Sequence, residues 1–118
     1  MKYRLVNSGR PAVFLLPSLK LKGLDGNGIR IDEKIDRFLL EKFGGYTVTS
    51  GNIFGHWKDE NGKDYYGEHK EYEVYFLGKH RIPHLARFLA QIAFDINEQC
   101  IYLKTGEDTW FVYPIPSK

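Results

Sequence analysis

One short stretch of the chain combines an acidic side chain with several large aromatic rings. Residues 55–70 contain Trp57, Tyr65 and Tyr66, followed by Glu68, with glycines between them. A carboxylate accepts hydrogen bonds from an ammonium group, and the faces of aromatic rings attract cations. This combination predicts a site for a positively charged small molecule, centred on Glu68. The structural alternative is that Glu68 is a solvated residue at a loop end and Trp57 fills a small local core.

The polar, glycine-punctuated character of residues 55–70 predicts a surface loop. Surface loops usually lack bulky aromatic residues, because apolar area left in water costs about 25 cal/mol per Å². A loop with these rings therefore either folds back on the body of the protein or holds a ligand. Function-bearing residues are often found on such loops.

Hydrophobic periodicity predicts the elements that come before this loop. Residues 12–16 form an apolar run that indicates a buried strand, and Pro17 interrupts it. Apolar residues recur at helical period in residues 32–43, and the glycines that follow favour a helix end. Residues 46–49 are β-branched and aromatic, which predicts a short strand.

The elements after the loop repeat this order. Residues 72–76 alternate as a strand with one packed face, which leaves Glu73 and Tyr75 on the other face. Residues 83–96 carry a second apolar stripe, and Pro83 suits the first turn of a helix. Two more strands, 100–103 and 110–113, would pair as a hairpin.

This order predicts a ferredoxin-like α+β sandwich, βαββαβ, in which an antiparallel sheet carries two helices on one face and an extra C-terminal strand. A chain of 118 residues suits a single domain covering 1–118. The helices cover one face only. The bare face is left for solvent, a ligand or another subunit, and we expect a homo-oligomer.

Composition argues against several classes of partner. Seventeen basic and fifteen acidic residues leave a net charge of +2, too balanced to indicate nucleic acid, and Glu71 and Glu73 would repel phosphate. No apolar run approaches the roughly 18 residues of a membrane span. The single cysteine, Cys100, excludes an internal disulfide and suits a reducing compartment, so we expect a cytoplasmic protein. The predicted role of Cys100 is a small core residue.

The four histidines do not predict a metal site. His80 and His84 are separated by Pro83, and no second cysteine or paired carboxylate completes a ligand set with His56 or His69. His69 could still titrate near Glu68.

Gln99 follows the second helix, in the connection to the next strand. Its amide could point to a subunit boundary, and the alternative is an ordinary exposed glutamine.

The layout resembles the small phage-type S-adenosylmethionine lyases (SAM hydrolase-like). The resemblance spans about residues 11–113. It rests on five features of the sequence: the run Pro11–Leu16, the triplet Gly55-His56-Trp57, Glu68 before a strand, the Ala- and Leu-rich segment Leu85–Ala90, and Glu98–Tyr102.

The resemblance implies a trimeric phage enzyme with sites between subunits. Its members convert S-adenosylmethionine to methylthioadenosine and homoserine lactone without metal or cofactor. By this resemblance Glu68 is catalytic and holds the substrate ammonium, Trp57 and Tyr66 bind the substrate, and Gln99 reaches in from the neighbouring subunit. Trp57 stands where the family tends to have a tyrosine, so any hydrogen bond of that hydroxyl is missing here. The alternative function is a non-catalytic ferredoxin-like module that binds a small ligand or a protein.

Overall fold

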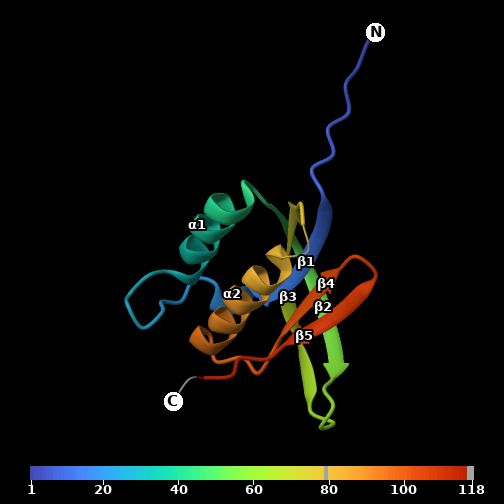
Figure 1. The fold of residues 1–118 in the computed structure, drawn as a ribbon. Coiled ribbons are helices and arrows are strands. Elements are labelled where there is room, and N and C mark those ends of the chain that lie inside the picture. Colours follow the sequence, from blue (N-terminus) through green and yellow to red (C-terminus); the bar gives the residue numbers. More distant parts are fainter. Residues whose placement is uncertain (79, 117–118) are drawn as a thin grey trace.

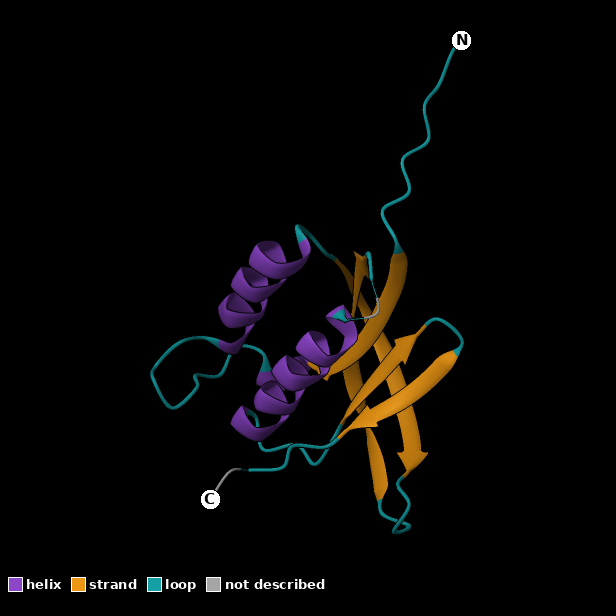
Figure 2. Ribbon diagram, viewed as in Figure 1, coloured by secondary structure: helices purple, strands orange, loops and turns teal. Residues whose placement is uncertain are grey.

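Two helices pack on one face of an antiparallel sheet, as Figures 1 and 2 show. The computed structural model describes residues 1–78 and 80–116. In chain order the elements are β1 (Arg10–Pro17), the short 3-10 helix η1 (Ser18–Lys20), α1 (Ile31–Phe43), β2 (Thr47–Lys58), β3 (Asp64–Phe76), α2 (Arg81–Asp95), β4 (Ile101–Thr105) and β5 (Asp108–Val112).

The strand order confirms the predicted ferredoxin-like α+β fold. Within the described residues the sheet has five strands in the order β2-β3-β1-β4-β5, and every neighbouring pair is antiparallel. The connections β1–α1–β2 and β3–α2–β4 therefore interleave, since β3 separates β1 from β2 and β1 separates β3 from β4. β5 is the predicted extra C-terminal strand, and it pairs with β4 as a hairpin.

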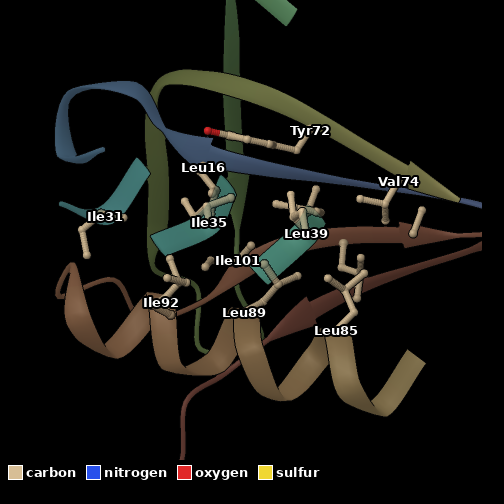
Figure 3. Packing of buried hydrophobic residues seen from close by; sticks show 14 of the residues in the cluster. Leu16, Ile31, Ile35, Leu39, Tyr72, Val74, Leu85, Leu89, Ile92 and Ile101 are labelled. Carbon is tan, nitrogen blue, oxygen red and sulfur yellow. The ribbon is translucent and has the colours of Figure 1, made fainter. Parts of the chain in front are cut away.

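The core lies between the sheet and the helices (Figure 3). Alternate residues of β1 and β3 face it, and the predicted packed face of β3, Tyr72, Val74 and Phe76, is buried. The Tyr72 ring stacks on Phe14 with centroids 5.3 Å apart. The helices contribute their apolar stripes, Ile31, Ile35 and Leu39 from α1 and Leu85, Leu89 and Ile92 from α2.

The other face of the sheet carries no helix in the described part of the chain (Figure 2). Glu73 and Tyr75 are exposed there, as predicted. In residues 1–78 and 80–116, no helix combines the length and the apolar character needed to cross a membrane.

The predicted loop over residues 55–70 is wrong. Residues up to Lys58 continue β2, and β3 begins at Asp64, so only residues 59–63 form a turn. Strand β2 is therefore much longer than the predicted 46–49, and a register shift between Thr49 and Ile53 interrupts its pairing. The tip of the hairpin projects at the end of the sheet opposite to the N-terminal segment (Figure 1).

An ion-pair network fixes the segment between η1 and α1. Lys34 Nζ lies 3.2 Å from Asp25 Oδ2 and 2.7 Å from Asp95 Oδ2. Asp25 Oδ1 also accepts hydrogen bonds from the backbone N–H groups of Asn27 and Ile29, at 2.8 and 2.9 Å. One lysine thus joins the loop before α1 to the last turn of α2.

Candidate active site

The candidate site lies at the beginning of β3, where one edge of this strand has no neighbouring strand among the described residues. β1 ends at Pro17, which lies opposite His69, so the beginning of β3 extends past its neighbour. Among the described strands, residues 64–68 of β3 pair with β2 alone. Side chains from both faces of the hairpin can reach this uncovered edge.

The Gly55–Trp57 spacing has a direct structural explanation. Residues two apart in a strand share a face, and the Trp57 indole lies across Gly55. A Cβ built on Gly55 would come within 1.9 Å of the Trp57 ring. Gly67 is the residue opposite Gly55 in the register, and a Cβ built on it would meet the His69 ring at 3.8 Å.

Trp57 joins a cluster of aromatic rings from four strands. Its ring centroid lies 5.3 Å from that of His69, 6.1 Å from Tyr102 and 6.0 Å from Phe111. Such distances are typical of favourable aromatic contacts. Trp57 Nε1 is buried and has no hydrogen-bond partner among the described residues. Trp57 therefore packs as one wall of the site. The structural alternative, in which Trp57 fills a small local core, predicts the same packing.

Glu68 and Tyr66 lie on the opposite face of the hairpin from Trp57 and Tyr65. Glu68 is half-buried and stands opposite Phe54 in the register. Tyr66 stands opposite His56, with their ring centroids 5.5 Å apart in an edge-on arrangement. Phe54 and Tyr66 keep 65% and 73% of their surface exposed. The carboxylate is therefore flanked by two aromatic rings that remain open to a ligand or to another chain.

A cavity of about 80 Å³ lies at the β3 edge, and residues from both faces of the hairpin are among those that line it. Three of the predicted site residues line it together, Glu68, Trp57 and Tyr66. Its other walls come from the end of β1 and from the α2–β4 connection, with Pro17, Glu98, Cys100 and Tyr102 among them.

Gln99 lies beside this cavity. It is exposed, between Glu98 and Cys100, and its side-chain amide contacts the hydroxyl of Tyr65, which lines the cavity. The Tyr65 hydroxyl also lies 3.1 Å from Asp59 Oδ2 in the hairpin turn. The structure therefore brings Gln99 near the other predicted residues within one chain.

Sequence reasoning missed part of this site. It left Tyr65 without a partner and gave neither Asp59 nor Glu98 a place in the site. Asp59 carries a local signal, because an aspartate two residues before an Asn-Gly pair is typical of a turn. Glu98 carries none, since its place depends on an ion pair with Lys20 at 2.7 Å, 78 residues away in sequence.

His69 is buried in the wall of the cavity, at 8% exposure. Its Nδ1 lies 2.9 Å from the carbonyl oxygen of Gly67. A carbonyl only accepts, so Nδ1 carries a proton and donates it. When the ring is neutral, Nε2 is then the unprotonated nitrogen.

Cys100 is a small buried residue, as predicted. Burial raises the pKa of its thiol, which keeps the sulfur protonated and unsuited to nucleophilic attack. Within residues 1–78 and 80–116, no three His, Cys, Asp or Glu side chains gather as a metal-binding group.

Comparison with known proteins identifies the fold. No protein-family model and no curated protein matches the sequence. Two solved structures match over nearly the whole chain. One, a phage SAM lyase in complex with S-methyl-5'-thioadenosine, has a TM-score of 0.60 at 9% identity, and the match covers 96% of this chain and 95% of that one. The chain shares the fold of phage SAM lyases.

A second such structure, a phage SAM lyase in the apo state, has a TM-score of 0.57 at 12% identity. The match covers 100% of this chain and 99% of that one. The predicted resemblance to phage SAM lyases is thus confirmed at the level of the fold. At these identities the likeness concerns the backbone arrangement alone.

Proposed function

We propose that this chain is a lyase that converts S-adenosylmethionine to methylthioadenosine and homoserine lactone. One observation carries the proposal: a fold shared with a phage SAM lyase that binds S-methyl-5'-thioadenosine accompanies a carboxylate, Glu68, that lines a cavity beside aromatic rings. The proposed site residues are Glu68 as the catalytic carboxylate, with Trp57, Tyr66 and Gln99 in substrate binding.

The chemistry of this reaction needs positioning more than proton transfer. The substrate carboxylate attacks the carbon of its own amino-acid chain that is attached to sulfur. The bond between that carbon and sulfur breaks, and its electron pair goes to sulfur. The negative charge of the carboxylate and the positive charge of the sulfonium are both lost, so no proton has to move. Holding reacting groups in the right geometry can remove about 7–11 kcal/mol of a barrier.

The residues of the candidate site suit this task. Glu68 would accept hydrogen bonds from the substrate ammonium, which would bend the amino-acid part toward the sulfonium. Tyr66 and Phe54 flank the carboxylate with exposed rings, and such rings attract a sulfonium through their faces. Trp57 would form the apolar wall, since it is held by three further rings.

The size of the cavity supports a site shared between subunits. Pockets that enclose ligands of this size usually measure about 300–1,000 Å³, whereas the cavity at the β3 edge measures about 80 Å³. A neighbouring chain that covers Phe54, Tyr66 and Gln99 would complete the enclosure. We therefore propose a homo-oligomer, a trimer by resemblance, with Glu68 at the boundary between protomers.

Replacing Glu68 tests the proposal directly. Glu68→Gln keeps the shape of the side chain but removes its charge, so the substrate ammonium loses its partner. We expect wild type to form methylthioadenosine from S-adenosylmethionine, and the variant to lose roughly tenfold to hundredfold in kcat/KM. Product is measured by chromatography.

The matched control is Glu60→Gln, because Glu60 is an exposed carboxylate in the hairpin turn, outside the lining of the cavity. This variant should keep wild-type activity, and both variants should keep the oligomeric state. A Glu68→Gln enzyme as fast as wild type would remove Glu68 from the mechanism.

A second candidate function follows from the bare face of the sheet, where Glu73 and Tyr75 are exposed. A non-catalytic module would use this face to bind a small ligand or a protein. Purified wild-type protein that forms no methylthioadenosine would favour this candidate.

A further inference from the structure

The residues before β1 form an arm, residues 1–9, that stands clear of the rest of the chain. Figure 1 shows it as an extended segment that points away from the sheet and the helices. Tyr3 and Leu5 keep 85% and 86% of their surface exposed. In the described part of the chain, residues 1–6 make no hydrogen bond and no ion pair. The arm therefore leaves apolar side chains in water, which is unfavourable unless another surface covers them.

The arm has two different faces when it is extended. Lys2 and Arg4 alternate with Tyr3 and Leu5, so a basic face lies opposite an apolar face. An extended chain spans about 3.3 Å per residue, so the arm reaches up to about 30 Å from the start of β1. The arm thus has the character of an extended peptide ligand with two positive charges.

A groove of about 610 Å³ lies at the end of the sheet where the arm begins, since Arg10 and Pro11 are among the residues that line it. This volume is in the range of about 300–1,000 Å³ that is usual for binding sites. The carboxylates of Glu107 and Asp108 outnumber Arg10, the one basic residue of the lining, so the groove has a negative net charge. Its large apolar residues come from β3, α2 and β5: Phe76, Ile82 and Trp110.

Trp110 is fixed in this groove before anything binds. Its Nε1 donates a hydrogen bond to Thr105 Oγ1 at 3.0 Å, and Thr105 is buried. The ring nevertheless keeps 51% of its surface exposed. A side chain that is already held in place loses little conformational entropy on binding, and tryptophan is enriched among the residues that dominate binding energies. The groove therefore suits an apolar or aromatic side chain that is accompanied by positive charge.

The arm is directed away from the groove of its own chain. β1 lies between β3 and β4 in the sheet. Residues 6–8 line a separate hollow together with Tyr75 and Leu77, at the end of β3, whereas Trp110 and the β4–β5 turn lie on the other side of β1. The groove that matches the arm in charge and apolar character is therefore the one on another copy of the chain.

We propose that the arm of one copy docks in this groove of a second copy, with its apolar face against Trp110 and its basic face beside the two carboxylates. Such a contact joins two different surfaces, so it closes into a ring when the rotation between copies allows. It lies at the end of the sheet opposite to the β2–β3 tip (Figure 1). It is therefore a second contact between copies, and it does not rest on the proposed function.

Cross-linking between two different chains tests the contact. Chains with Leu5→Cys are labelled with ¹⁵N and equilibrated with unlabelled chains that carry Pro11→Cys, since Pro11 is exposed and lines the groove. A short bis-maleimide is added, and mass spectrometry measures the peptide that joins residue 5 of one chain to residue 11 of the other. Cys100 is buried, and wild type gives its background.

The matched control replaces the groove chain by Glu60→Cys, because Glu60 is exposed in the β2–β3 turn, at the far end of the sheet. The joined peptide should be at least tenfold more abundant with Pro11→Cys than with this control, by roughly the factor that a weak specific contact gives. Equal yields with the two partners would overturn the proposal.

Charge reversal on the same two chains tests the basic face. Lys2→Glu with Arg4→Glu on the arm chain should lower the yield by roughly tenfold, because the reversed charges repel the carboxylates of the groove. Glu107→Lys with Asp108→Lys on the groove chain should then restore the yield. A reversed arm that cross-links like the original, or a yield that stays low when both chains are reversed, would contradict the proposed pairing.

These measurements need no substrate, so they separate this inference from the proposed function. If wild type forms no methylthioadenosine, the proposed function fails, and the cross-link between residues 5 and 11 still decides whether the arm docks. If wild type is active but this cross-link does not exceed its control, the arm contact alone is overturned.

Discussion

At the scale of single residues, the glycine under Trp57 is as important as the tryptophan. The indole occupies the space that a Cβ on Gly55 would need, and three rings hold it there. A tyrosine in this position would be smaller and would carry a hydroxyl, whereas Trp57 presents an N–H group that is buried without a partner among the described residues. The Trp57 wall of the site is therefore defined by the shape of the indole ring and not by a hydrogen bond within the described residues.

Gly55→Ala tests this arrangement. The new methyl group would lie 1.9 Å from the Trp57 ring, so the indole has to leave the cluster. We expect a loss of about 1–3 kcal/mol in the free energy of unfolding, the usual range for overpacking, together with a changed tryptophan fluorescence spectrum. Denaturant titration measures the first effect.

Gly26→Ala is the control for this substitution, because nothing lies within 4 Å of a Cβ built there. It should change the free energy of unfolding by much less. Equal stability of the Gly55→Ala variant and wild type would show that the ring does not depend on the glycine.

At the scale of elements, the body of the fold could be predicted from hydrophobic periodicity, whereas the hairpin could not. The apolar stripes of α1 and α2 and the alternation of β3 from Tyr72 to Phe76 follow directly from one-sided burial. The β2–β3 tip has no such pattern, because no residue of 53–68 belongs to the hydrophobic core. Glycine, normally a loop signal, here makes room for Trp57 within a strand.

The candidate site likewise has a part that could be predicted from local sequence and a part that could not. Glu68, Trp57 and Tyr66 could be grouped from their closeness in sequence, and they do line one cavity. Their separation onto two faces of a hairpin followed only from the strand assignment. The contact between Tyr65 and Gln99 joins residues 34 apart, and no local pattern indicates it.

The ion pairs around Lys34 make a prediction for the loop before α1. The hydrogen bond from the Ile29 N–H is the main cause that lowers the pKa of the Asp25 carboxyl in the folded state, with further lowering by Lys34. A carboxylate with a lowered pKa stabilises the fold above its unfolded pKa of about 3.9, and this contribution is lost as pH falls through the folded value.

Asp25→Asn should therefore melt at a lower temperature than wild type at pH 7. The difference should shrink as pH falls below about 4, because wild type then loses the same charge. Thermal unfolding followed by circular dichroism at several pH values measures this, with Glu60→Gln, an exposed carboxylate of the β2–β3 turn, as control. A difference that does not depend on pH would argue against a role for the charge.

At the scale of the whole molecule, the proposal is that one protomer carries only part of the site. The cavity is small, and Phe54, Tyr66 and Gln99 beside it are exposed. Exposed aromatic residues at one place are typical of an interface. The proposed assembly would cover these residues and enclose the substrate in one step.

Dilution tests this dependence on assembly. If the site needs two protomers, specific activity should fall when the protein is diluted below the dissociation constant of the oligomer, and it should return on concentration. Activity assays across a dilution series, paired with light scattering to give the mass at each concentration, measure this. A monomer with full specific activity would contradict a shared site.

The position of the β2–β3 tip outside the hydrophobic core has an evolutionary consequence. Apart from Gly55 and Trp57, residues 53–68 lie outside both the aromatic cluster and the packing between sheet and helices, so changes in them can reshape ligand preference at little risk to folding. Libraries that randomise this hairpin but keep Gly55 and Trp57 should give mostly folded proteins, whereas libraries over the helix stripes should not. A protein built in this way can diverge widely in its recognition surface while its backbone stays the same.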